Sequence, residues 1–254
     1  MSEIQQQAWL LSFLAQVCLA VVITRRQLPY PFFRAWLWAS VIRTGILRVA
    51  GNTNETPYIA AYLVTEPILL ALLAAVVMEL FHQRASGLVM VGRTGTILFT
   101  VLVGVAAVVT ALTFLSGSQA PREAALASII ALRRTALTLM LAFLAATLFF
   151  FYKFPAPGRL NLLIHHILLT VNIAGPVAAI IGIWFDPLHT HHYNTIALTC
   201  TSTSFLAWLV LLRRQGEREP ALIGQDKAEA IERSAGELVD ELRSAAKSAR
   251  RPRD

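Results

Sequence analysis

The sequence predicts an all-α fold, a polytopic bundle of seven transmembrane helices. Of the 254 residues, 56% are hydrophobic and 15% are charged, whereas a soluble domain carries about 25% charged residues. The apolar residues also form runs long enough to cross a hydrocarbon core of about 30 Å as helices. We therefore expect an integral membrane protein with a transmembrane domain in residues 1–214 and a polar tail in residues 215–254.

The apolar runs predict the positions of the seven helices. These cover residues 8–24, 32–50, 58–81, 95–116, 135–154, 160–185 and 195–212. The second helix is the least apolar, because it carries Arg34, Arg43 and Arg48. Before the fifth helix, the segment PREAALASIIALRR either extends that helix or lies in the membrane interface. The first run is expected to remain as a helix, because its arginines follow the apolar stretch, whereas those of a signal peptide precede it.

The distribution of basic residues predicts the orientation of the bundle. Every second loop is basic, and so is the segment after the last helix. Their basic residues are Arg25, Arg26, Arg34, Arg84, Arg93, Lys153, Arg159, Arg213 and Arg214. In the alternate loops, Arg122 is the only clear basic residue. Cytoplasmic loops are enriched in lysine and arginine, so we expect the amino terminus outside and the carboxyl terminus inside. Arg133 and Arg134 depart from this pattern and fit it only at the outer interface.

The net charge of +7 is explained by the membrane, and we expect no nucleic-acid partner. The basic residues lie beside apolar runs, and the final stretch KSARRPRD suits anionic lipid, so the expected partner is the lipid bilayer. In the tail, apolar residues at steps of three and four predict a cytoplasmic helix over residues 226–249. Its heptad seam is rich in alanine and buries little area, so we expect weak self-association or a protein partner there.

Polar residues inside the apolar runs are the candidate ligand-binding residues. Glu66 stands next to Pro67 in LVTEPILLAL. Counted at 1.5 Å per residue, Glu66 and Arg43 lie about 12 and 10 Å below the outer ends of neighbouring helices. Intramembrane charges usually face the bundle interior and pair, so we predict an Arg43–Glu66 ion pair. A protonated, unpaired Glu66 is the alternative.

Further polar residues fall in the last two helices. Asn172 lies in the sixth helix, and Thr199 and Ser202 belong to a run of hydroxyl residues in the seventh. Small hydroxyl side chains allow close helix packing and hydrogen bonds between membrane helices. They also suit the wall of a polar path, and both interpretations stay open.

The outer loop DPLHTHHY is a candidate metal site. Asp186, His189, His191 and His192 are competent ligands for Zn²⁺ or Cu²⁺, although their spacing matches no closed site. No other cofactor is expected. His165 and His166 are adjacent on one helix and diverge by about 100°, which does not suit bis-histidine haem ligation.

The stretch PYPFFRAWLWASVIRTGIL followed by YIAAYLVTEPILLALLAAVVMELF resembles the helix 2–3 block of uncharacterised bacterial seven-helix membrane proteins. The resemblance covers about a fifth of the chain and carries no function over. With it, we expect the protein in the cytoplasmic membrane of a bacterium.

No catalytic constellation stands out, which favours a binding protein over an enzyme. We expect a receptor-like or regulatory protein that binds a ligand in the bundle and engages a partner through its tail. One alternative is a small transporter or channel with a polar path past Glu66, Arg43 and Asn172. The other is a structural subunit of a larger membrane complex, in which the buried polar residues are contacts.

The orientation can be tested with reporter fusions. A reporter that is active only in the cytoplasm should work after Arg214 and fail at Asn54 and His191, because only the first of these follows the basic pattern of the inner loops. Cytoplasmic activity at His191 would contradict the charge argument and the number of helices.

Overall fold

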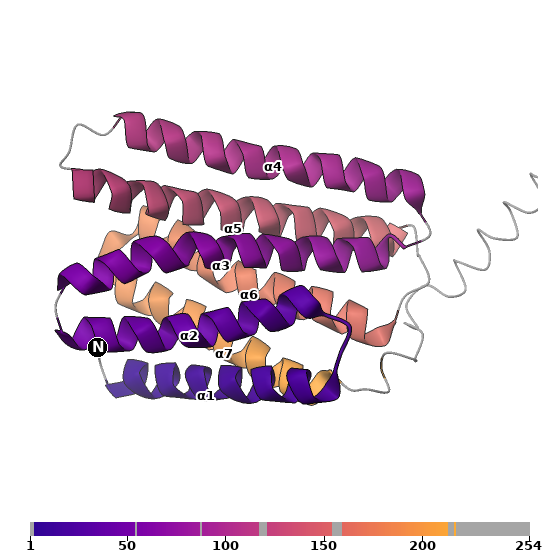
Figure 1. Cartoon of the computed structure of the whole chain (residues 1–254), viewed down its shortest axis with the longest axis horizontal. Coiled ribbons are helices and arrows are strands. Elements are labelled where there is room, and N and C mark those ends of the chain that lie inside the picture. The colour runs from indigo at the N-terminus through magenta and orange to yellow at the C-terminus, as the bar shows by residue number, and fades with distance from the viewer. Residues whose placement is uncertain are drawn as a thin grey trace, which may run out of the picture.

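The chain folds into seven α-helices, seen in a computed structural model. The structure describes residues 3–53, 55–86, 88–116, 121–153, 159–212 and 216. The helices are α1 (Glu3–Arg26), α2 (Pro31–Thr53), α3 (Glu55–Arg84), α4 (Val89–Ser116), α5 (Pro121–Lys153), α6 (Leu160–Phe185) and α7 (Thr190–Leu211), with a 3₁₀ turn, η1 (Pro187–His189), before α7. Successive helices run antiparallel along the long axis of the molecule (Figure 1). The regular elements of these ranges are all helical, so the all-α prediction is confirmed.

Within the described ranges, six of the seven helices are long and apolar enough to cross a membrane. The helix that falls short is α2, whose Arg34, Arg43 and Arg48 lower its hydropathy. Its 23 residues still span about 34 Å at 1.5 Å per residue, slightly more than a hydrocarbon core of about 30 Å. The protein is accordingly a helical membrane bundle.

Six of the helices form a closed ring, and α4 lies outside it. Around the ring, α1 packs on α2, α2 on α3, α3 on α5, α5 on α6, α6 on α7, and α7 on α1. In contrast, α4 packs mainly on α5 and makes a much smaller contact with α3 (Figure 1). The first and last helices are therefore neighbours, and α4 has most of its surface free to face lipid.

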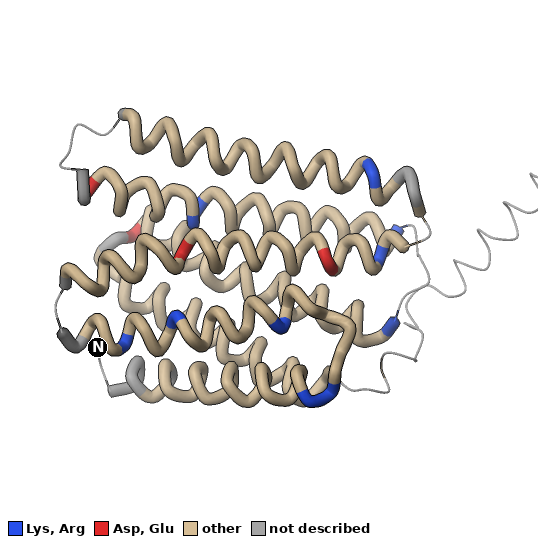
Figure 2. Tube along the Cα trace, viewed as in Figure 1, with Lys and Arg blue, Asp and Glu red and all other residues tan. Residues whose placement is uncertain are grey.

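Basic residues are most numerous near one end of the bundle, although Arg43, Arg48, Arg133 and Arg134 lie in the other half. At one end, α1, α3 and α5 finish and α2, α4 and α6 begin; we call it the basic end (Figure 2). The described basic residues near it are Arg25, Arg26, Arg34, Arg84, Arg93, Lys153 and Arg159. At the opposite end α6 turns into α7, and the acidic residues Glu123 and Asp186 lie there.

The start of α2 is held by a carboxylate from α3. Pro31 is the first residue of α2 and has no N–H, which suits this position. The next two backbone N–H groups, of Phe32 and Phe33, donate to Glu79 Oε1 at 3.4 Å and Oε2 at 3.1 Å. Gln83 Nε2 of α3 also donates to the carbonyl of Pro29 at 2.7 Å. Donors that a helix start leaves without partners are thus satisfied from a neighbouring helix.

Several predicted helix boundaries were wrong. The helix α5 begins at Pro121 and not at 135, so the segment before it extends the helix. Likewise α7 begins at Thr190 and not at 195, and α4 at Val89 and not at 95. Hydrophobicity marks the apolar part of a helix, and in α5 an alanine-rich segment of high helix propensity extends the helix before that part. The predicted tail helix at 226–249 lies outside the described residues.

Close packing of α6 on α7 depends on small residues. A Cβ added to Gly175 of α6 would lie 2.6 Å from Cys200 Cβ of α7, which is fixed to the backbone and cannot move aside. Gly104 of α4 has nothing within 4 Å of the same position. A substitution of alanine for glycine therefore causes a steric clash at residue 175 and none at residue 104.

We predict that Gly175→Ala destabilises the protein and that Gly104→Ala does not. Overpacking typically costs about 1–3 kcal/mol, so thermal unfolding in detergent should occur several degrees lower for Gly175→Ala. Gly104→Ala should unfold at the wild-type temperature or slightly above it, because alanine favours helix. Equal unfolding temperatures for the two variants would show that α6 and α7 are not in close contact.

Candidate functional site

The predicted ion pair between α2 and α3 is present. Arg43 Nη2 contacts Glu66 Oε2, and the side chains are 18% and 6% exposed. The two helices are antiparallel neighbours, so residues at matching depths meet. Glu66 is therefore ion-paired, and the prediction of the pair is confirmed.

A second arginine, which the sequence argument missed, binds the other oxygen of the same carboxylate. Arg133 Nε of α5 lies 3.4 Å from Glu66 Oε1, and its side chain is 40% exposed. Arg133 Nη1 also donates to Tyr62 Oη at 3.4 Å. The ring of Tyr62 has its centroid 5.3 Å from the guanidinium carbon of Arg43. We call Arg43, Tyr62, Glu66 and Arg133 the arginine–glutamate cluster.

This cluster lies far from the basic end of the bundle. At 1.5 Å per residue, Glu66 is about 27 Å along α3 from Arg84, and Arg133 is about 30 Å along α5 from Lys153. These distances are close to the thickness of the hydrocarbon core. Arg133 thus lies about one hydrocarbon thickness from the basic end, and its place at the outer interface stays a prediction.

The arginine–glutamate cluster carries more positive than negative charge. Two guanidinium groups share one carboxylate, and the Nε of Arg43 is buried with no hydrogen-bond partner among the described residues. Guanidinium groups bind carboxylate and phosphate through paired N–H donors. The cluster can therefore accept an additional anion.

One cavity opens beside this cluster, in the half of the bundle away from the basic end. It lies between α3, α5, α6 and α7, has a volume of about 430 Å³, and we call it the vestibule. Arg133, Arg134 and Tyr62 line one wall, and Asn194 and Thr201 line another. The rest of its lining is apolar or proline and comprises Ile130, Pro176, Ala179, Ile180, Ile183, Ala197 and Leu198. The vestibule combines a basic wall with apolar ones.

A second cavity reaches the cluster from the other side. It has a volume of about 380 Å³, and Trp9, Arg43, Arg48 and Tyr58 are among its lining residues. The guanidinium carbon of Arg48 lies 5.3 Å from the centroid of the Trp9 ring. The Arg43–Glu66–Arg133 bridge thus lies between two cavities. Arg43 lines the second cavity, and Arg133 lines the vestibule.

Towards the basic end, the interior of the ring is filled by aromatic side chains. Tyr30 just before α2, Phe33 of α2, His165 of α6 and Trp208 of α7 are fully buried. The ring centroid of His165 is 4.1 Å from that of Phe33 and 4.9 Å from that of Tyr30. The ring centroids of Phe33 and Trp208 are 4.9 Å apart. We call these four residues the aromatic plug, because their rings are buried and pack against one another near the basic end.

The other polar candidates, Asn172, Thr199 and Ser202, do not join the cluster. Thr199 Oγ1 donates to the carbonyl of Thr195 at 2.8 Å and is exposed on α7, and Ser202 Oγ donates to the carbonyl of Leu198 at 2.8 Å. Asn172 is buried, and its Nδ2 has no hydrogen-bond partner among the described residues. The hydroxyls bond within their own helix, which favours the packing interpretation over a polar wall.

The four candidate metal ligands lie at the turn from α6 to α7. His189 Nδ1 is 2.7 Å from Asp186 Oδ2, whereas His191 and His192 belong to the first turn of α7 and not to a loop. The rings of His189 and His192 stack with centroids 5.7 Å apart. In the described part of the chain, no three histidine, cysteine, aspartate or glutamate side chains gather around one point. Zinc or copper binding by these residues stays a prediction.

No protein-family model, no curated protein and no solved structure matches the chain. The resemblance of residues 29–47 and 58–81 to uncharacterised bacterial seven-helix membrane proteins therefore stays untested.

The arginine–glutamate cluster yields a prediction about stability. Removing one partner of a buried ion pair typically costs about 3–5 kcal/mol, whereas removing both sides costs less. Glu66→Gln should therefore lower the unfolding temperature in detergent more than Arg43→Gln, because it leaves two arginines without a counter-charge. The double variant should recover part of the loss of Glu66→Gln.

Arg134→Gln is the matched control, since no ion pair of Arg134 with Glu66 is present. This variant should unfold close to the wild-type temperature. Strictly additive losses in the Arg43/Glu66 double variant would contradict the pair.

Proposed function

We propose that this protein is a receptor-like protein of the bacterial cytoplasmic membrane that binds an anionic ligand from outside the cell. The observation that carries the proposal is the excess of arginine on one wall of the vestibule. Arg133 and Arg134 line a cavity of about 430 Å³, while Glu66, the carboxylate bound by Arg133, is also shared with Arg43. Ionisable residues within membrane helices commonly mark binding sites.

The proposed orientation places the vestibule outside and the tail inside. It rests on the basic end of the bundle, because lysine and arginine are enriched on the cytoplasmic side. The proposal counts α2 as a seventh span, since it runs antiparallel between α1 and α3, which are both long and apolar enough to cross (Figure 1). The charge of Arg43 on α2 is offset by Glu66, which lowers the cost of placing this helix in lipid.

The lining of the vestibule favours a ligand with both an oxyanion and an apolar part. Arg133 and Arg134 supply donors for a carboxylate or phosphate. Ile130, Ile180 and Ile183 supply apolar contacts on the remaining walls. Binding pockets for small molecules usually have this composition, a mostly apolar lining with a few placed polar groups.

The aromatic plug favours a receptor over an open channel. The four rings are buried and pack against one another in the interior near the basic end, which opposes a continuous water-filled path along the bundle axis. A transporter in its outward-facing state is the second candidate. It is favoured by Pro67 next to Glu66 and Pro176 on the vestibule wall, because a proline inside a helix frees a carbonyl and eases bending.

We predict that phenyl phosphate stabilises the purified protein. A ligand present at ten times its Kd adds about 1.4 kcal/mol, which should raise the unfolding temperature in detergent by about 3–6 °C. Inorganic phosphate, which lacks the apolar part, should have a smaller effect. The effect of phenyl phosphate should be lost in Arg133→Gln and in Arg134→Gln, since both side chains line the vestibule.

Arg48→Gln is the matched control, because this arginine lines the other cavity and should leave the stabilisation unchanged. If phenyl phosphate stabilises no variant differently from the wild type, the vestibule is not an anion site. Uptake of phenyl phosphate into proteoliposomes would assign the transporter in place of the receptor.

A further inference from the structure

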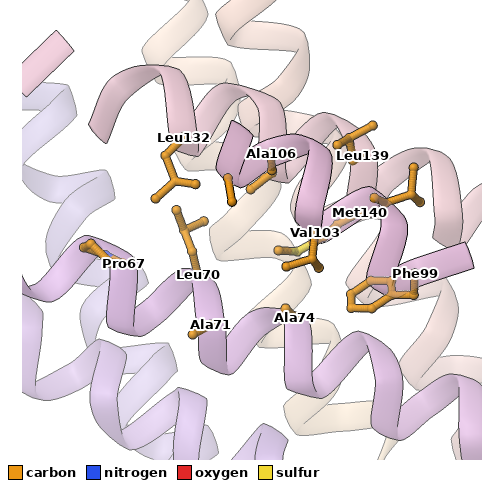
Figure 3. Close-up of a pocket in the computed structure, with 13 residues that line it drawn as sticks. Pro67, Leu70, Ala71, Ala74, Phe99, Val103, Ala106, Leu132, Leu139 and Met140 are labelled. Atoms are coloured by element: carbon orange, nitrogen blue, oxygen red, sulfur yellow. The ribbon is translucent and has the colours of Figure 1, made fainter. Parts of the chain in front are cut away.

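An apolar groove runs along the side of the bundle between α3, α4 and α5. Its volume is about 180 Å³, and side chains from all three helices point into it (Figure 3). Every lining residue is apolar or proline, and the lining includes Pro67, Leu70 and Ala71 of α3, Ala106 of α4, and Leu132 and Met140 of α5. The groove lies within the membrane-spanning parts of these helices, so the medium at its open side is lipid.

The shape of the groove follows from the position of α4 outside the ring. Towards the basic end, α3 and α4 are in close contact, since Gly95 of α4 leaves no room for a Cβ beside the Phe81 ring. His82 Nε2 and Thr96 Oγ1 are 3.1 Å apart at the same level. From there the two helices separate towards the opposite end (Figure 1). The groove is therefore closed at one end and open at the other.

Its closed end is filled by three phenylalanine rings. The ring centroid of Phe143 lies 5.3 Å from that of Phe81 and 5.0 Å from that of Phe99, both in edge-on contacts. Above them, Ala71, Ala74 and Ala106 leave the space that larger side chains would fill.

The size of the groove decides which occupant fits. A transmembrane helix is about 10 Å in diameter and would need a continuous groove across the membrane. The phenylalanine rings block such a helix, whether from a second copy or from another protein. A cavity of about 150 Å³ with an apolar lining stays dry and binds a molecule of the size of benzene. A single hydrocarbon chain matches both the cross-section and the open end.

Charge at the open end indicates the rest of the occupant. Pro67 and Leu132 line the groove there. Pro67 is the residue after Glu66, and Leu132 is the residue before Arg133. The two arginines of the cluster exceed its one carboxylate in charge. An apolar chain in this groove thus ends beside a net positive charge near the membrane boundary.

We propose that the groove holds one acyl chain of an anionic phospholipid of the outer leaflet, with the lipid phosphate at Arg133. The position of the headgroup rests on the proposed function, because it uses the same excess of arginine. The position of the acyl chain rests on the groove alone.

Photolabelling of the full-length protein in nanodiscs tests the proposal. The probes are phosphatidylglycerol and phosphatidylcholine, each with a diazirine in one acyl chain and present at equal mole fraction. Leu70, Ala136 and Met140 are buried, so bulk lipid does not reach them unless a chain enters the groove. Phosphatidylglycerol should label them about fivefold more than phosphatidylcholine, the ratio expected for one contact between an arginine and an anionic lipid.

Ala71→Phe places a ring in the open side of the groove and should reduce the labelling of Met140 severalfold. Ala74→Leu fills the same space with a smaller side chain. It replaces Ala71→Phe in the experiment if Ala71→Phe does not fold. Val105→Phe is the matched control, because Val105 lies on α4 with its side chain exposed and does not line the groove. It should leave the labelling of Met140 unchanged.

Two results would overturn the proposal. Labelling of Met140 that persists in Ala71→Phe would show that no chain lies in the groove, and stabilisation by phenyl phosphate would then still support the vestibule as an anion site. Equal labelling of Met140 by the two lipids would show that the headgroup is not bound at Arg133. If phenyl phosphate also failed to stabilise the protein, the proposed function would fail with it.

Discussion

The carboxylate of Glu66 joins three helices of the ring. Its two oxygens face Arg43 of α2 and Arg133 of α5, while Glu66 itself belongs to α3. An arginine at the centre of a membrane helix costs about 2.5–3.5 kcal/mol on insertion scales, and α2 carries three. Because Glu66 offsets this cost for Arg43, α2 can lie in the bundle although it is less apolar than the six candidate spans. The cavities, the groove and the net positive charge are all arranged around this bridge.

The two halves of the bundle are stabilised differently. Near the basic end, helix ends are joined by hydrogen bonds: Glu79 accepts from the start of α2, and the Arg26 guanidinium donates to the carbonyl of Leu212 at the end of α7. The aromatic plug fills the interior above these contacts. In the opposite half, cavities of about 380 and 430 Å³ flank the arginine–glutamate cluster. Changes in helix position therefore meet less packing resistance in that half.

Much of the fold followed from the sequence, and the limits have physical causes. Hydropathy predicted the seven helices, and counting residues to matching depth predicted the Arg43–Glu66 pair. The same method missed Arg133, because the predicted fifth helix covers residues 135–154 and Arg133 lies just before it. Its mismatch with the charge pattern was the available signal, since a basic residue on the non-basic side needs a counter-charge. Cross-helix contacts such as Glu79 with the start of α2 depend on which helices are neighbours, and one sequence does not give that.

The order of helices around the ring also constrains how the protein is made. The ring closes where α1 meets α7, so its closure joins helices that lie far apart in the sequence. Arg43 and Glu66 are near in sequence, so their pair can form as soon as α3 has been inserted. Phe33 on α2, in contrast, meets its partners His165 and Trp208 only after α6 and α7 have been synthesised. During translation the early helices thus present an incomplete aromatic surface to the bilayer, and a chain cut short before α7 keeps that surface exposed to membrane quality control.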